Sequence, residues 1–200
     1  IRFLKGLPEE AKLCLVELVL PNNKPVFDTF KEVHLHVSVT TDKAELWCKE
    51  ALINIGIKSL PPSCDKVCWM DADVEIRRPD WYGDVARLLD THPVVQPHSN
   101  FVFMEEDETP DKVYPIERQH KSFALEANRR AESGWRGRPI NFIHYHPGHA
   151  WAARIDFLKS IEYLFPFCIL GHGDIVMCTG FSGHYPTMRH LWKSKQGLDV

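Results

Sequence analysis

Hydrophobic and polar positions follow two rhythms along the first part of the chain, one typical of strands and one typical of helices. Residues 13–20 are a short run rich in leucine and valine, and residues 34–39 alternate with a period of two. Both segments therefore predict strands, whereas apolar and charged positions at helical spacing predict a helix over residues 43–57. The prolines at positions 61 and 62 then force a break.

The alternation continues to about residue 95. Residues 66–70 (KVCWM) read as a buried strand, residues 81–90 as a helix that follows Pro79 and Asp80, and residues 94–95 as a further strand. This βαβ rhythm predicts an α/β fold with a central, mostly parallel sheet flanked by helices.

The pattern changes in residues 104–138, which are first acidic and then basic, with few aliphatic residues. We interpret this stretch as a long, partly mobile excursion, because long loops inside a compact domain are usually functional or disordered. Residues 142–153 resume the ordered pattern, and helices are expected over residues 155–163 and 174–181.

Composition narrows the class of protein. The 200 residues are enough for a single domain, residues 1–200, with a core of its own, and 44% are hydrophobic. The formal net charge of −3 argues against a nucleic-acid partner, which favours a strong basic excess. No signal peptide and no transmembrane segment is visible, and none of the six cysteines forms a Cys-x-x-Cys pair. We therefore expect a soluble, cytoplasmic domain.

The sharpest chemical feature is a pair of aspartates, Asp71 and Asp73, directly after the apolar segment KVCWM. In a strand, side chains two residues apart point to the same face, and the carboxyl ends of strands in an open α/β sheet border the ligand crevice. A hard divalent cation such as Mg²⁺ or Mn²⁺ relieves the repulsion between two such carboxylates and bridges to phosphates. Asp-x-Asp alone is a weak motif, and aspartates are also common in turns after strands, so its meaning depends on its surroundings.

Four segments between residues 47 and 190 supply those surroundings. The first is WCKEALINIGI at residues 47–57, which precedes the Asp-x-Asp strand, and the second is GHAWAAR at residues 148–154. The third is GHGD at residues 171–174, and the fourth is TMRH at residues 187–190. In this order they resemble the β-1,4-galactosyltransferase-like group of GT-A glycosyltransferases. The resemblance implies a GT-A fold, which is Rossmann-like, and a first strand before residue 13, where residues 1–12 read as a helix.

The resemblance also implies roles for individual residues. The general base is Asp174, which deprotonates the acceptor hydroxyl. Contacts to the nucleotide-sugar donor come from Lys49, Asn54, Asp71, Gly148 and Trp151. Ligands of Mn²⁺, or of Mg²⁺, are Asp71, Asp73 and His190.

Each of these roles has a structural alternative. Asp174 follows glycine at a predicted helix start, where aspartate is favoured as a cap. Lys49 fits an ordinary helix surface, Asn54 could hold a neighbouring strand, and Trp151 could belong to the core. His144 and His146, which precede Gly148 in the sequence, either flank the donor or belong to a separate histidine cluster.

The function implied is transfer of a sugar from a nucleoside diphosphate, UDP by analogy, to a carbohydrate or glycoconjugate acceptor. Transfer proceeds with inversion if Asp174 lies across the sugar from the diphosphate, and with retention if it cannot reach. Two other functions stay open: a phosphohydrolase that uses the Asp-x-Asp carboxylates, and a non-catalytic module that binds a nucleotide sugar.

Overall fold

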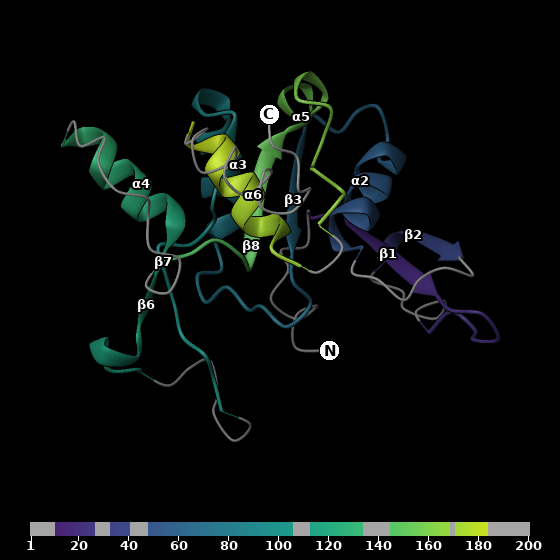
Figure 1. The fold of residues 1–200 in the computed structure, drawn as a ribbon, viewed down its shortest axis with the longest axis horizontal. Coiled ribbons are helices and arrows are strands. Elements are labelled where there is room, and N and C mark those ends of the chain that lie inside the picture. The colour runs from purple at the N-terminus through teal and green to yellow at the C-terminus, as the bar shows by residue number, and fades with distance from the viewer. Residues whose placement is uncertain are drawn as a thin grey trace, which may run out of the picture. The chain divides into compact units, whose positions relative to one another are not determined.

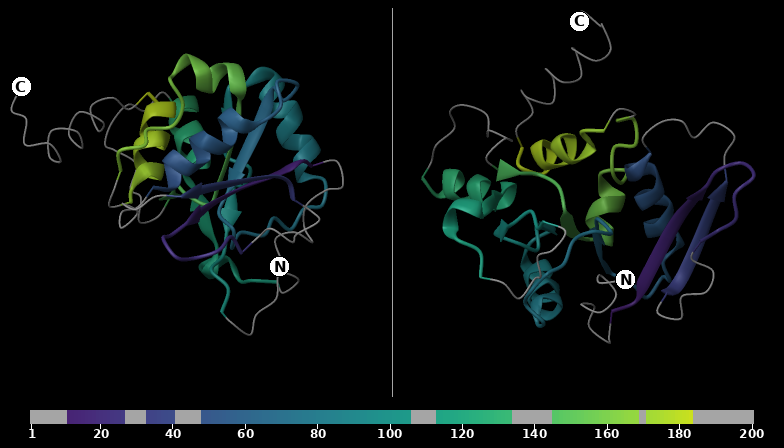
Figure 2. Two further views of the ribbon diagram at one scale, coloured as in Figure 1. Left: turned by 90° about the vertical axis from the view of Figure 1, so that its right-hand side faces the viewer. Right: turned by 90° about the horizontal axis from the view of Figure 1, so that it is seen from below.

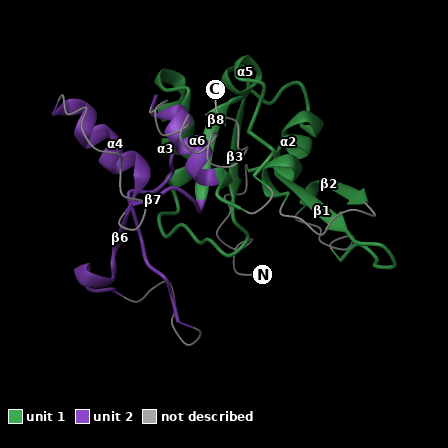
Figure 3. Ribbon diagram, in the orientation of Figure 1, with its two compact units in different colours: residues 1–95, 150–173 green, residues 96–149, 174–200 purple. Residues whose placement is uncertain are grey.

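The computed structural model describes residues 11–26, 33–40, 48–105, 113–133, 145–168 and 171–183. Five α-helices and three small sheets lie in these ranges, so the chain has a mixed α/β fold (Figure 1). It divides into two compact units (Figure 3). Unit 1 contains residues 1–95 and 150–173, and unit 2 contains residues 96–149 and 174–200. That residues 1–200 act as one domain stays a prediction.

The first sheet of unit 1 has two parallel strands, β1 (Leu13–Val19) and β2 (Val33–Thr40). Helix α2 (Lys49–Ser59) packs against β1 (Figure 2). Gly56 makes this approach possible, because a Cβ at its position would lie only 2.7 Å from Val16 Cγ2. Both predicted strands are confirmed, as is the later part of the predicted helix. Its first residues, 43–47, lie outside the described ranges.

The second sheet of unit 1 has the order β3-β8-β4, with bounds Lys66–Met70, Ala150–Arg154 and Val94–Val95. The central strand β8 is antiparallel to both neighbours, and its first four residues are at most 3% exposed. Helix α3 (Trp81–Thr91) covers the sheet by packing apolar residues against Ala152. Helix α5 (Ile155–Ser160) follows β8 directly and packs against it.

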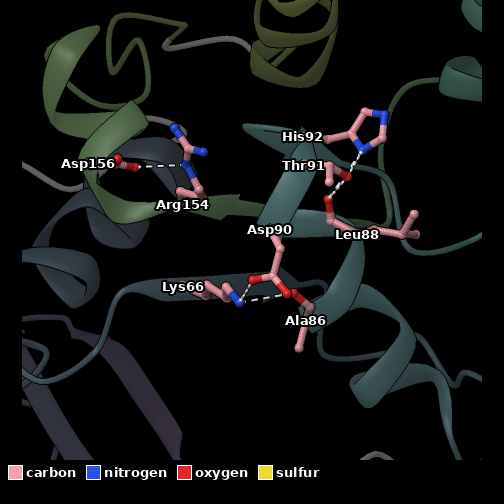
Figure 4. A network of polar contacts seen from close by, with 8 residues as sticks. All are labelled: Lys66, Ala86, Leu88, Asp90, Thr91, His92, Arg154 and Asp156. Carbon is pink, nitrogen blue, oxygen red and sulfur yellow. Dashed lines mark hydrogen bonds and ion pairs between the residues drawn. The ribbon is translucent and has the colours of Figure 1, made fainter.

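Polar contacts fix α3 along β3. Lys66 Nζ donates to Asp90 Oδ1 at 2.5 Å and to Ala86 O at 3.0 Å (Figure 4). The hydrogen bond to Asp90 raises the pKa of Lys66 above its usual value. The start of the strand is thereby tied to the last turns of the helix that covers it.

Within the described residues, the strands do not form the expected central, mostly parallel sheet. The sheet that holds β3 is antiparallel throughout, because the strand between β3 and β4 arrives from the second half of the chain. The βαβ rhythm of the first half carries no information about that strand.

Unit 2 contains a sheet in the order β5-β6-β7, with bounds Asn100–Phe101, His120–Ser122 and Tyr145–His146. Strand β5 is antiparallel to β6, whereas β7 is parallel to it. A 3₁₀ turn, η1 (Ile116–Arg118), precedes β6, and helix α4 (Phe123–Glu132) follows it. Helix α6 (Gly173–Phe181) begins at the last residue of unit 1 and continues in unit 2.

The interpretation of residues 104–138 as an irregular excursion is wrong for its centre, which forms β6 and α4. The helix is capped by Ser122, whose Oγ accepts a hydrogen bond from the Leu125 N–H at 3.3 Å. Its apolar stripe is weak because the buried position Glu126 is charged. Arg129 and Arg130 donate to that carboxylate at 2.8 and 2.6 Å, and these bonds lower the pKa of Glu126 to about 2.

Two further expectations bear on the environment of the chain. All six cysteines lie in described ranges and all are free thiols. A search of the described helices for one that is long and apolar enough to cross a bilayer finds none.

Two helical glycines provide a test of the packing between α2 and β1. We expect Gly56→Ala to lower the free energy of unfolding by about 1–3 kcal/mol, because the clash with Val16 outweighs the gain in helix propensity. Gly83 in α3 is the matched control, since its Cβ would meet only Arg87 Nη1, at 3.6 Å. Gly83→Ala should raise stability by up to about 1 kcal/mol. Urea unfolding of both variants measures the difference, and equal stabilisation by both would contradict the packing.

Candidate functional site

The two aspartates of the Asp-x-Asp motif lie in a turn. Strand β3 ends at Met70, and the Val74 N–H donates to Asp71 O at 3.1 Å, which closes a four-residue turn. The prediction that both side chains share one face of a strand is therefore wrong, because the strand does not continue through them. The turn places Asp73 in solvent, while the Asp71 side chain is about one third exposed.

Lys49 approaches this turn from the start of α2. Its Nζ lies 2.6 Å from Asp71 Oδ1, and both side chains are partly exposed. Such a pair adds only about 0–1 kcal/mol to stability. Its importance is chemical, because it puts a positive charge beside the Asp71 carboxylate in the same turn that carries Asp73. The structure thus brings together two predicted donor contacts, Lys49 and Asp71.

The oxygen ligands of the turn suit a hard divalent cation. Among the described residues, no group of three or more His, Cys, Asp and Glu side chains is placed to hold a metal ion. His190, the third predicted ligand, lies outside those residues. A cation that bridges to substrate phosphates uses only one or two protein carboxylates. Asp71 and Asp73 fit that mode of binding.

Two other predicted donor contacts are engaged in the core of unit 1. Asn54 Nδ2 donates to Leu164 O at 2.7 Å, and its Oδ1 accepts from the Leu164 N–H at 3.0 Å. Trp151 is 3% exposed and lies opposite Trp69 in the β3–β8 register. These contacts give both residues structural roles, and their contact with a donor stays a prediction.

Glu50, the residue after Lys49, is a buried carboxylate that sequence reasoning missed. It is 2% exposed, and a Cβ added at Gly173 would overlap its Oε1. The carboxylate therefore lies directly against the Gly173 backbone, where only glycine fits. In the sequence, the sign that a group packs closely at this point is Gly173 itself, the second glycine of the GHGD segment.

In unit 2, Asp174 and His146 border the same small space at Gly148. A Cβ on Gly148 would lie 3.0 Å from Asp174 Oδ2 and 2.9 Å from His146 Cε1. His146 Nδ1 accepts a hydrogen bond from the Gly148 N–H at 3.0 Å, so a neutral His146 carries its proton on Nε2. The structure thus brings Gly148 and Asp174 together, as predicted for two site residues, and adds His146 to them.

Gln96 holds this loop in place and was not anticipated. Its Nε2 donates to His146 O at 3.3 Å and to Gly148 O at 3.2 Å, while its Oε1 accepts from the Ala124 N–H at 2.9 Å. Gln96 is buried, so these bonds replace contacts with water. The loop that carries Gly148 is thereby fixed to the start of α4. The sequence contains no motif that marks this glutamine.

Six rings pack together in the same unit, and we call them the ring cluster. Its members are His98, Phe101, Phe103, His120, His146 and His149. His146 and His149 stack at 4.2 Å with 15° between their planes, and Phe101 lies 4.4 Å from His149. His149 has a φ of 76°, a left-handed conformation that is uncommon for a residue with a side chain.

His98 is a largely buried histidine of this cluster. Its Nε2 is buried and has no hydrogen-bond partner among the described residues. Burial, followed by the nearby His149 and His146, lowers the pKa of His98 to about 4. The ring is therefore neutral near pH 7 and opposes protonation in mild acid.

Comparisons with known protein families, curated proteins and solved structures find no match. The resemblance seen in the sequence therefore stays an expectation, and function has to be argued from the site itself.

The low pKa of His98 predicts a loss of stability in acid. The unfolded chain takes up the proton near pH 6.5, whereas the folded chain resists it until about pH 4. The free energy of unfolding should thus fall over this window by up to about 3 kcal/mol. His98→Phe should flatten the slope, measured by urea unfolding at several pH values. His92→Phe, at an exposed histidine, is the control and should keep the wild-type dependence of the free energy of unfolding on pH. The same dependence in His98→Phe would contradict the assignment of the pH effect to His98.

Proposed function

We propose that the protein is a metal-dependent glycosyltransferase of the GT-A type, a hexosyltransferase that moves a sugar from a nucleoside diphosphate to an acceptor hydroxyl. UDP is the proposed nucleotide, by analogy with the family that the sequence resembles. The observation that carries the proposal is the turn after β3, where Lys49 lies 2.6 Å from Asp71 and Asp73 is exposed to solvent.

Charge at this turn supports the binding of a diphosphate. Two carboxylates without a cation would repel the phosphates, while a lysine alone would attract them only weakly. With a bound divalent cation, the turn presents positive charge from both the ion and Lys49. A cation held by Asp71 and Asp73 would supply Lewis acidity that stabilises negative charge on the departing diphosphate.

The cation also affects Lys49. A divalent cation bound by Asp71 would weaken the attraction between this carboxylate and the Lys49 ammonium group. The lysine can then donate to a phosphate oxygen from the first turn of α2, where backbone N–H groups also favour anions.

Asp174 is the proposed general base. Its carboxylate Oδ2 lies close against Gly148, where an added Cβ would be only 3.0 Å away, so the close approach of this carboxylate needs glycine. His146 lies beside the same glycine, and its Nδ1 accepts a hydrogen bond from the Gly148 N–H. A carboxylate is a group that can accept the proton of an acceptor hydroxyl.

The test is slow hydrolysis of UDP-, GDP- and dTDP-sugars with Mn²⁺, Mg²⁺ or EDTA. We expect metal-dependent release of one nucleotide, and Asp73→Ala should reduce it by more than about 100-fold. Even residues that merely support metal ligands typically contribute 10–100-fold. Glu75→Ala is the matched control, because Glu75 is an exposed carboxylate two residues further on.

Two outcomes of this assay would identify a different function, and one variant separates the base from the metal site. Release of a nucleoside monophosphate and a sugar phosphate, in place of the nucleoside diphosphate and free sugar, would identify a phosphohydrolase. Metal-dependent donor binding without turnover, even when acceptors are added, would identify a binding module. Within a transferase, Asp174→Asn should keep metal-dependent donor binding and lose transfer, which separates the base from the metal site.

A further inference from the structure

The ring cluster of unit 2 has an exposed end. Phe103 is 58% exposed, and His120 is exposed as well. Their rings lie 5.6 Å apart, and His120 stacks on Phe101 at 5.3 Å with 22° between the planes. Small-ligand sites are lined mainly by aromatic and apolar side chains with a few polar groups, and this exposed end has that composition.

The exposed rings are held in place by the backbone. Phe101 on β5 lies opposite His120 on β6 in the sheet register. Arg118 Nη2 donates to Phe103 O at 2.9 Å, which fixes the chain just beyond β5. A platform fixed in this way loses little side-chain entropy when a ligand binds.

The other end of the cluster reaches the proposed base. Phe103 lies 5.9 Å from His149 and 6.4 Å from His146, measured between ring centroids. His146 shares the space at Gly148 with Asp174. Ring contacts are therefore continuous from the exposed Phe103 to the imidazole beside the carboxylate.

We propose that Phe103 and His120 form the acceptor subsite and bind a pyranose ring. The C–H face of a sugar packs on an aromatic face, whose electron-rich surface attracts the C–H hydrogens. The imidazole nitrogens of His120 donate to, and accept from, sugar hydroxyls. A few polar groups on an otherwise aromatic surface are typical of small-ligand sites. The inference rests on the proposed function, since it places a sugar acceptor near Asp174.

Aliphatic residues close by in the sequence favour a different occupant. Val113 and Ile116 are 85% and 78% exposed, and a protein or a membrane surface would use such aliphatic groups as well as the rings. The continuity of Phe103 with the histidines favours the sugar, because aliphatic contacts would not need imidazole groups. The two occupants differ in their dependence on Ile116: a sugar on the rings does not need this side chain, whereas an aliphatic partner does.

The experiment is saturation-transfer NMR with methyl glucoside, methyl galactoside and methyl N-acetylglucosaminide as probes, in the absence of donor and metal. We expect at least one probe to bind the wild-type protein, and Phe103→Ala to weaken it about fivefold or more. Phe103→Tyr should retain binding, and Ile116→Ala is the matched control that leaves it unchanged. Thermal unfolding checks that the exposed substitutions preserve the fold.

Several results would overturn the inference. They are absence of binding by every probe, equal binding by wild type and Phe103→Ala, and an equal loss in Ile116→Ala, which would indicate an aliphatic interaction surface. The sugar titration needs neither donor nor metal, so its outcome is independent of donor hydrolysis. Phe103-dependent sugar binding in a protein that hydrolyses no donor would reject the proposed function and leave the sugar site standing.

Discussion

Unit 1 depends on the burial of β8 between β3 and β4. This strand has alanine at three of its five positions, and Ala152 and Ala153 are fully buried. Small side chains let α3 pack closely on the sheet through Trp81, Val85 and Leu89. Because the register pairs Met70 with Ala150, β8 also fixes the end of β3 from which the Asp71 turn emerges. The position of the acidic turn is therefore a consequence of core packing.

Glycine has a common role in both units. Gly173 admits the buried carboxylate of Glu50, and Gly148 admits Asp174 and His146. At each position a Cβ would occupy the space that a functional group now fills. These glycines belong to GHGD and GHAWAAR, two of the four segments on which the resemblance to glycosyltransferases rests. Their physical explanation is the close approach of charged or titratable groups, which holds whatever reaction the protein catalyses.

The sequence predicts local structure well where one face of an element is apolar. Residues 66–70 form β3 as expected, and the helix predicted over residues 81–90 is α3, which packs its apolar residues on the sheet. Prediction fails where tertiary contacts decide. Helix α4 is hidden because a buried glutamate replaces part of its apolar stripe, and the antiparallel position of β8 depends on a partner far along the chain.

The site shows the same division. Lys49 and Asp71 were both expected at the donor site from the motifs and do lie together, whereas the turn over residues 71–74 was not expected. Glu50 and Gln96 carry no motif, because their importance comes from burial and from partners remote in sequence. The ring cluster was anticipated only through His146. Its other members lie on or near β5, β6 and β7, and strands of two or three residues are too short to show an alternating hydrophobic pattern.

We propose that the turn after β3 binds a nucleoside diphosphate through a divalent cation. The decisive measurement is calorimetric titration of UDP into the wild-type protein, once with Mn²⁺ and once with EDTA. We expect binding with Mn²⁺ and its loss in EDTA. Equal binding under both conditions, or no binding of UDP, GDP or dTDP with Mn²⁺ present, would contradict it.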